Sequence, residues 1–185
     1  MTFLEGYRQD LCGTLGKIDL GRVRQAIDWL AEVRDRGGTV FTCGNGGSAS
    51  TASHFAGDLL KGASYNHPRR WRVICLADPM PAVSAYANDV GYAAIFVEQL
   101  KNFASPGDLL LAISGSGNSP NVVAAAEYAR SVGARTIALT GRDGGQLGQR
   151  VDLNILVPVQ HMGRIEDAHL AICHMMGYWF MQFAP

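Results

Sequence analysis

Apolar residues recur along the chain with two different periods. Near the N-terminus they return every three or four positions, from Phe3 to Leu15 and again from Val23 to Val33, as on the buried face of an amphipathic helix. Short runs that are apolar almost throughout come next, bounded by glycine and polar turn residues, and such runs are typical of buried strands. We predict strands at 39–43, 71–77, 108–114, 135–140 and 152–158.

Helical spacing returns between these strands and after the last one. The expected helices cover about 50–60, 80–103 with a break near 88–92, 119–131 and 164–183. Strands that alternate with helices indicate an α/β fold, and five of them suit a parallel, doubly wound, flavodoxin-like sheet flanked by helices. The 185 residues are expected to form one domain over 1–185, with 1–36 as an N-terminal helical extension and 37–185 as the α/β core.

The amino-acid composition limits the kinds of molecule that the protein is expected to bind. Sixteen basic and sixteen acidic side chains cancel, so the chain lacks the net charge typical of proteins that bind nucleic acid or an anionic membrane surface. No apolar run approaches the roughly 18 residues of a membrane span, and the first residues do not resemble a signal peptide. Neither close pairing nor zinc-ribbon spacing links the cysteines, which are Cys12, Cys43, Cys75 and Cys173. We therefore expect a reduced, cytoplasmic protein that contacts neither nucleic acid nor membrane.

Two loops rich in glycine, serine and asparagine follow predicted strands and precede predicted helices. They are GNGGS at 44–48 and SGSGNS at 114–119. Either loop alone is explained by an ordinary turn, with Ser119 as a helix N-cap and Pro120 in the first turn. The presence of both loops at the carboxyl edge of one parallel sheet favours a ligand site. In such a site backbone N–H groups and hydroxyls would surround an anion. Neither matches a nucleotide-binding loop, because the Gly-Lys-Ser/Thr ending and the acidic residue of a dinucleotide site are missing.

Several longer motifs together resemble one known family. The segments CGNGGSAS and HFAGDL, then ANDVGY, ISGSGNSPNVV, TIALTGRDGGQL and RIEDAHLAICHMM, are similar to the sugar isomerase (SIS) domain, and within it to the phosphoheptose isomerases. The resemblance extends over nearly the whole chain, including the two N-terminal helices. It implies an aldose–ketose isomerase that interconverts sedoheptulose 7-phosphate and glycero-manno-heptose 7-phosphate through an enediol. It also implies a homotetramer with sites between subunits and one divalent metal ion, zinc, per subunit.

The resemblance also assigns roles to individual residues. It implies a phosphate cradle made of Ser114, Gly115, Ser116 and Ser119. It implies that the substrate is also contacted by Asn45, Gly46, Gly47, Ser48, Asn88, Asp89 and Glu166. The positions that correspond to zinc ligands are His54, Asp58, Glu166 and His174. Of these four, Asp58 and His174 also correspond to the acid/base pair of the family.

Spacing supports part of this metal site independently. His54 and Asp58 are four residues apart, so they share one face of a helix and offer half of a site for a divalent metal. Such a pair is also common as a plain surface hydrogen bond. His174 lies eight residues after Glu166, about 80° away around a helix, whereas Asp167 lies on nearly the same face as His174. Helical geometry thus favours Asp167 as a ligand and the resemblance favours Glu166, which we adopt.

The chain departs from the family pattern at three positions. Asp58 stands where the family has a glutamate, Glu166 where it has a glutamine, and Gly163 where an aspartate that contacts the substrate is common. Two imidazoles and two carboxylates still suit zinc. Two alternatives stay open: an isomerase for a different phosphosugar, and a non-catalytic SIS protein that binds a phosphosugar or acts as an adaptor, for example in replication initiation. The presence of His54, Asp58 and His174 argues against the adaptor.

The last predicted helix is apolar on nearly every face. Its segment 168–183 reads AHLAICHMMGYWFMQF. We interpret His169 within it, and His161 before it, as structural residues or as supports for the site. A helix of this kind is typically buried all round, and one small sheet covers only one side of it. We therefore expect a partner chain to cover the other side.

Overall fold

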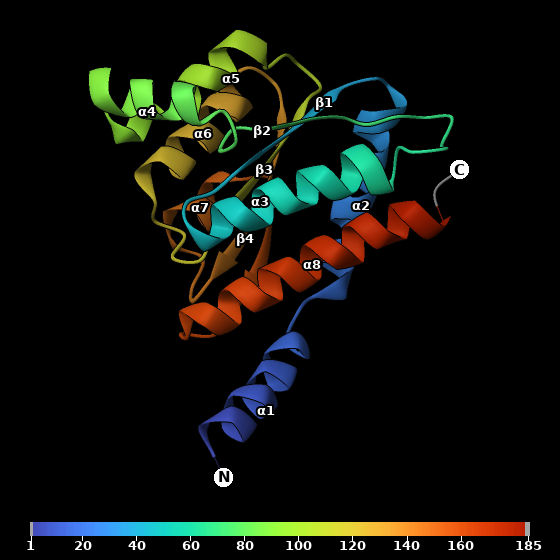
Figure 1. The fold of residues 1–185 in the computed structure, drawn as a ribbon, viewed down its shortest axis with the longest axis vertical. Helices are drawn as coiled ribbons and strands as arrows, with labels where there is room; N and C mark the ends of the chain where they lie inside the picture. The colour runs from blue at the N-terminus through green and yellow to red at the C-terminus, as the bar shows by residue number, and fades with distance from the viewer. Residues whose placement is uncertain (1, 184–185) are drawn as a thin grey trace.

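The computed structural model describes residues 2–183, and it contains all five predicted strands (Figure 1). The strands are β1 (Thr39–Cys43), β2 (Arg72–Cys75), β3 (Leu109–Ser114), β4 (Arg135–Gly141) and β5 (Leu153–Val157). The α-helices are α1 (Phe3–Leu15), α2 (Leu20–Asp35), α3 (Gly47–Gly57), α4 (Met80–Asp89), α5 (Val97–Phe103), α6 (Pro120–Ser131), α7 (Gly145–Arg150) and α8 (Met162–Phe183). A π-helical turn, η1 (Asp58–Gly62), extends α3, and a 3-10 turn, η2 (Tyr92–Ala94), separates α4 from α5.

The five strands form one parallel sheet in the order β2-β1-β3-β4-β5. Neighbouring strands pair without interruption, as where residues 109–114 of β3 align one to one with 135–140 of β4. This order is that of a flavodoxin-like sheet, which confirms the predicted fold class. The chain reverses its direction of winding between β1 and β3, and a ligand is expected beyond the carboxyl ends of these two strands.

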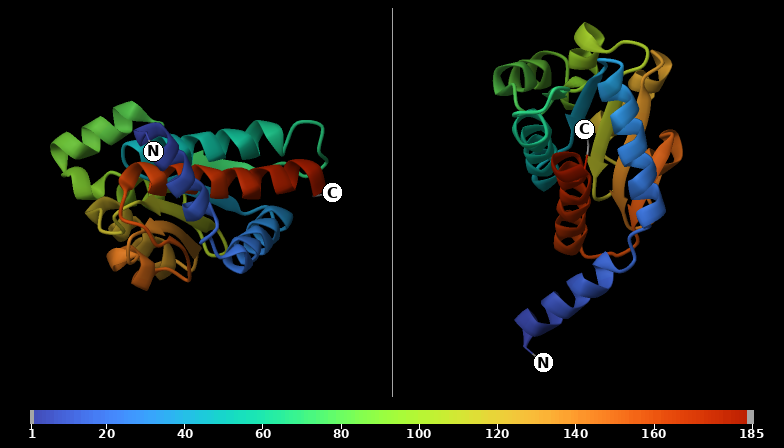
Figure 2. Two further views of the ribbon diagram at one scale, coloured as in Figure 1. Left: turned by 90° about the horizontal axis from the view of Figure 1, so that it is seen from below. Right: turned by 90° about the vertical axis from the view of Figure 1, so that its right-hand side faces the viewer.

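Helices cover both faces of the sheet (Figure 2). Each face has its own apolar core. On one face α2, α3 and α8 bury side chains such as Leu30, Phe55 and Phe180. On the other face α5, α6 and α7 pack around side chains such as Phe41 and Phe96. α3 and α8 lie side by side on the first face (Figure 1). Residues far apart in the sequence can therefore meet between these two helices.

The structure differs from the sequence predictions mainly at the ends of elements. The helix expected from about residue 50 begins at Gly47, directly after the glycine loop, and the strand expected over 71–77 is confined to β2. α7 is absent from the sequence prediction, because its sequence GQLGQR holds two glycines and one large apolar residue, which is too little for a helical pattern. The expected break in the helical region 80–103 is confirmed by η2.

α1 projects from the body of the domain (Figure 2, right). It packs against the first turns of α8, where the Tyr7 hydroxyl donates to Asp167 Oδ2 at 2.7 Å. Its apolar side chains Phe3 and Leu4 remain 77% and 76% exposed. α2, by contrast, contributes several apolar side chains to the core of the domain.

α8 buries one side and leaves the other open. Met175 and Tyr178 on its outer side are 40% and 52% exposed, although the helix is apolar almost all round. A single chain thus covers only the side of α8 that faces the sheet and α3. Within residues 2–183 no helix combines the length and the apolar character needed to cross a membrane.

Candidate active site

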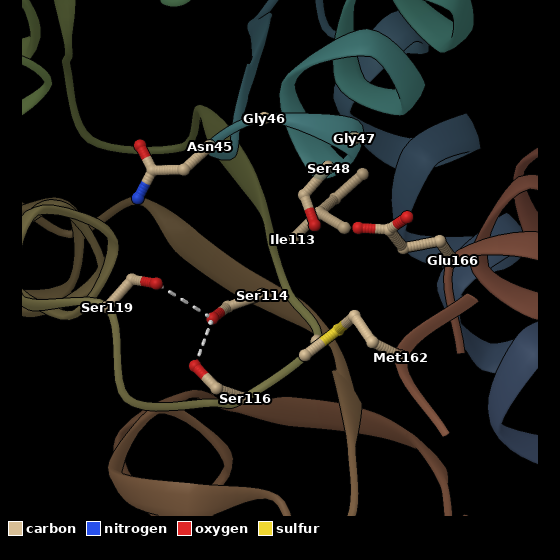
Figure 3. A pocket seen from close by; sticks show the side chains of 11 residues that line it. Asn45, Gly46, Gly47, Ser48, Ile113, Ser114, Ser116, Ser119, Met162 and Glu166 are labelled. Atoms are coloured by element: carbon tan, nitrogen blue, oxygen red, sulfur yellow. Dashed lines mark hydrogen bonds between the residues drawn. The ribbon is translucent and has the colours of Figure 1, made fainter. Parts of the chain in front are cut away.

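A cavity of about 260 Å³ opens at the carboxyl ends of β1 and β3, where the sheet topology predicts a ligand (Figure 3). Both glycine-rich loops and the first turns of α8 contribute to it. It is lined by Asn45, Gly46, Gly47, Ser48, Ile113, Ser114, Gly115, Ser116, Ser119, Met162 and Glu166. The structure thus brings together the residues expected to contact the substrate, with the exception of Asn88 and Asp89.

Three serine hydroxyls converge on one side of this cavity (Figure 3). Ser114 Oγ lies 3.3 Å from Ser119 Oγ and 3.5 Å from Ser116 Oγ. Ser119 holds the N-cap position of α6, as predicted, but its hydroxyl makes no capping bond to the helix. The loop bends here because Gly117 has φ +66°, and a Cβ on it would collide with the carbonyl oxygen of Gly144. Hydroxyls not used for capping, together with the first N–H groups of α6, suit the oxygen atoms of an anion.

A carboxylate lies on the opposite side of the cavity. Glu166 extends from the start of α8 toward the start of α3, so close that a Cβ on Gly47 would lie 2.7 Å from one carboxylate oxygen. Gly47 is the first residue of α3, and the N-terminal N–H groups of a helix attract negative charge. No lysine or arginine is among the described residues that line the cavity. A phosphate in it would therefore rest on neutral donors, with one carboxylate across from them.

A second group of side chains lies farther along α3 and α8, and we call it the His–Asp cluster: His54, Asp58 and His174. His54 Nε2 lies 2.9 Å from His174 Nε2 and 3.5 Å from Asp58 Oδ2. One ligand atom from each residue lies within 4.8 Å of the others. The shared helix face predicted for His54 and Asp58 is confirmed, and the neighbouring α8 adds His174.

The chemistry of the His–Asp cluster fits a divalent metal ion. Asp58 Oδ2 is buried and has no hydrogen-bond partner in the described part of the chain. A buried carboxylate oxygen without a partner calls for an explanation, and a cation is one. Two imidazole nitrogens and a carboxylate oxygen are the ligands that zinc binds in proteins. The residues present therefore fit the metal that the family resemblance implies.

Several other predicted residues lie outside the His–Asp cluster. Glu166 belongs to the cavity lining instead, and within the described chain the structure does not bring it to the other three ligand candidates. Asp167, which helical spacing favoured, accepts the hydrogen bond from Tyr7. Spacing fixes the angle between two residues on α8, but it cannot tell on which side of α8 the helix α3 lies. Asn88 and Asp89 stand exposed at the end of α4, where the Asn88 amide donates to Asp89 Oδ1 at 2.8 Å.

Residues that the sequence did not single out complete the surroundings of the cavity. Ile113 and Met162 line it, and Tyr92 and Asn121 hold the side chain of Asn45. Asn121 lies two residues after the loop 114–119 and is followed by five apolar residues, so its polar side chain was a signal that could have been used. The contact from Tyr92 had no such signal, because it depends on how η2 folds back on the loop after β1.

His169 is fully buried on the inner side of α8, in agreement with a structural role. Neither ring nitrogen has a hydrogen-bond partner in the described residues. Burial lowers the pKa of His169 to about 4 from an ordinary value of 6.5, against a smaller opposing influence from the backbone of Thr140. The neutral imidazole is therefore the form that the folded chain accommodates.

This burial predicts a pH dependence of stability. Above pH 6.5 the imidazole of His169 is neutral in both the folded and the unfolded chain. In that range it therefore does not make the free energy of unfolding depend on pH. Between pH 6.5 and about 4 only the unfolded chain takes up the proton, and the free energy of unfolding falls as the pH is lowered, by about 3 kcal/mol at most. Urea unfolding across this range should show a steeper loss for the wild type than for His169→Gln. Parallel pH profiles for the two proteins would contradict the prediction.

Comparisons of the sequence with known proteins agree with this arrangement. The family model of the SIS domain matches residues 7–141. The phosphoheptose isomerase of Aliarcobacter butzleri is 43% identical over 153 residues, which cover 82% of this chain and 80% of that protein. The phosphoheptose isomerase of Chlorobaculum parvum is 39% identical over 185 residues, which cover 93% of this chain and 87% of that protein.

Comparisons of the fold agree as well. The structure of a phosphoheptose isomerase from Neisseria gonorrhoeae superposes with a TM-score of 0.89 at 30% identity, covering 96% of both chains. That of a phosphoheptose isomerase from Francisella tularensis gives a TM-score of 0.91 at 29% identity, covering 98% of this chain and 100% of the other. Sequence and fold thus match proteins of the same name, over 80% or more of each chain compared. The chain belongs to the SIS-domain family and, within it, to the phosphoheptose isomerases.

Proposed function

We propose that this protein is an aldose–ketose isomerase that interconverts sedoheptulose 7-phosphate and glycero-manno-heptose 7-phosphate. The observation that carries the proposal is the presence of two chemically distinct groups: the serine hydroxyls that converge on one side of the cavity, and the His–Asp cluster farther along α3 and α8. His54 follows Gly47 by seven residues on α3, which is about 10 Å along the helix axis. One extended phosphosugar can therefore place its phosphate and its carbonyl end near different groups.

In this proposal Asp58 is the base. Its carboxylate removes the proton from the carbon next to the substrate carbonyl, which gives a cis-enediol, and Asp58 or His174 returns a proton to the neighbouring carbon. The electron pair of the broken C–H bond stays within the substrate, so the reaction needs no redox cofactor. The phosphate, held by Ser114, Ser116 and Ser119, supplies binding energy that positions the reacting end.

We also propose that the His–Asp cluster holds one divalent metal ion, zinc, per subunit. His54, Asp58 and His174 would bind it, whereas Glu166, the fourth ligand position that the family resemblance implies, lies in the adjoining cavity and outside the cluster. When bound, such an ion would polarise the carbonyl and hydroxyl oxygens of the substrate. The four cysteines are free thiols, which supports the proposed cytoplasmic location, since reduced cysteines are the rule there.

An isomerase for a different phosphosugar is the second candidate, and the position of Glu166 favours it. In this chain the carboxylate of Glu166 lies across the cavity from the serines, at a position where the family resemblance implies a neutral amide. A carboxylate accepts hydrogen bonds but donates none, so it selects hydroxyl donors on the sugar. A change in sugar specificity would follow from that, without a change in the reaction.

The phosphate cradle can be tested separately from the isomerisation step. Replacing Ser116 and Ser119 with alanine removes hydroxyls that would bind the phosphate, and each such bond to a charged group contributes about 1.5–3 kcal/mol. Calorimetric titration with sedoheptulose 7-phosphate should therefore show affinity reduced by about a hundredfold or more, at an unchanged melting temperature. Unchanged affinity would mean that the loop is only a turn.

We propose the homotetramer with sites between subunits that the family resemblance implies, and the exposed apolar surfaces support contact between chains. The outer side of α8 places Met175 and Tyr178 next to His174, and Phe3 and Leu4 project on α1. A second chain that covered these side chains would also shield the His–Asp cluster from water. Light scattering at micromolar concentration is expected to give the mass of a tetramer, and a stable monomer would contradict both the assembly and the shared site.

A further inference from the structure

The two glycine-rich loops are joined by a pair of amide hydrogen bonds. Asn45 Nδ2 donates to Asn121 Oδ1 at 2.8 Å, and Asn121 Nδ2 donates to Asn45 Oδ1 at 2.8 Å. The residues are 76 positions apart, and they connect the loop after β1 to the start of α6. Asn121 is 1% exposed and lies outside the lining of the cavity, whereas Asn45 is part of that lining.

A backbone donor fixes the orientation of both side-chain amides. The N–H of Val122 donates to the side-chain oxygen of Asn121 at 3.0 Å, and only the amide oxygen can accept it. The oxygen of Asn121 is thereby identified, so the group of Asn45 that faces it must be the Nδ2 donor. The Tyr92 hydroxyl donates to Asn45 Oδ1 at 2.9 Å, in agreement with that orientation.

These bonds leave Asn45 with one unused polar position. Its Oδ1 accepts from Asn121 and from Tyr92, which fills both lone pairs, and one of its two amide hydrogens is donated to Asn121. The remaining hydrogen is a donor on Nδ2, and that nitrogen is the end of the carboxamide nearer to Ser119 (Figure 3). A ligand atom bound there has to offer a lone pair, as a hydroxyl, carbonyl or phosphate oxygen does.

We propose that Asn121 is a positioning residue for the isomerase: it locks the Asn45 carboxamide so that a single N–H donor faces the phosphosugar. This inference rests on the proposed function for the identity of the ligand. Asn121 touches no substrate itself and acts through Asn45. A carboxamide free to rotate would present its oxygen to the cavity part of the time, and that oxygen repels the oxygens of the ligand.

A double-mutant cycle tests this coupling. Sedoheptulose 7-phosphate is titrated calorimetrically into the wild type, Asn121→Ala, Asn45→Ala and the double variant. We expect Asn121→Ala to raise Kd about tenfold in the wild type and less than about twofold in the Asn45→Ala background. Thr136→Val is the matched control, because Thr136 is also fully buried and loses hydrogen bonds to Asp152 at the opposite edge of the sheet. It should lower the melting temperature and leave Kd unchanged.

The outcomes separate this inference from the proposed function. If Asn121→Ala raises Kd equally in the wild type and in Asn45→Ala, or if Thr136→Val raises Kd as much, Asn121 is not a positioning residue. Either result would leave the proposed isomerase function unaffected. A wild type that neither binds nor converts the phosphosugar would contradict the proposed function instead. In that case NMR hydrogen exchange of the Asn45 side-chain amide tests whether Asn121 holds this amide in place. Asn121→Ala should accelerate the exchange and Thr136→Val should not. Equal exchange rates in the wild type, Asn121→Ala and Thr136→Val would show that Asn121 does not hold the Asn45 carboxamide.

Discussion

Asp58→Asn is expected to abolish isomerisation and to leave phosphosugar binding nearly intact. The substitution keeps the size of the side chain and removes the charge that takes up the proton, and a positioned base contributes about 10²–10⁴-fold to the rate. The serine side of the cavity, which holds the phosphate in our proposal, is formed by other residues. Turnover assays and calorimetric titration with sedoheptulose 7-phosphate on the same preparation measure the two effects.

The control for this variant is Asp19→Asn. Asp19 caps α2 by accepting from the N–H groups of Gly21 and Arg22, and asparagine caps a helix about as well. Asp19→Asn therefore removes a carboxylate that does not line the cavity, at little cost in stability. If Asp58→Asn keeps a rate within a few-fold of the wild type and only its melting temperature falls, Asp58 is a structural residue and the assignment of the base is wrong.

His174→Ala is expected to remove both bound metal and activity. The variant takes one of two imidazoles from the His–Asp cluster, which leaves His54 and Asp58 as an incomplete pair. Metal analysis of the purified protein should show zinc in the wild type and a marked loss in the variant, with a rate lower by about 10²–10⁴-fold. Phosphosugar affinity should change little, since the serines are untouched.

His67→Ala provides the comparison, because His67 lies in the loop before β2 and outside the cluster. It should retain metal and rate. A wild-type protein that is fully active without metal would remove the ion from the proposal and leave Asp58 and His174 as a plain acid/base pair. Metal retained in His174→Ala would show that the ligands lie elsewhere.

The sequence is sufficient to predict the sheet, because each of the five strands contains a short apolar run that is followed by turn residues. β3 is buried at every position, and that is why its run stands out. Parallel strands end at a common edge, so the strand pattern by itself also places both glycine-rich loops together. α7 is not predictable in this way, because its glycines and polar residues carry no helical pattern and its contacts with α6 and β4 stabilise it.

The site is predictable in its parts but not in its assembly. The spacing of His54 and Asp58 identifies a shared helix face, whereas the approach of His174 depends on α8 running beside α3. The position of Glu166 at Gly47 depends on the same packing, so spacing along α8 cannot reveal it. The amide pair of Asn45 and Asn121 joins two loops 76 residues apart, and no local pattern indicates such a contact.

Incubation with sedoheptulose 7-phosphate in deuterium oxide tests the central claim most directly. We predict that NMR will show conversion to the aldose, with deuterium at the carbon next to its carbonyl, because an enediol exchanges its proton with solvent. A panel of other phosphorylated ketoses run in parallel identifies the preferred sugar. Faster conversion of another ketose would correct the substrate and keep the reaction. Binding of the phosphosugars without conversion or deuterium incorporation would contradict the isomerase and favour a protein that only binds them.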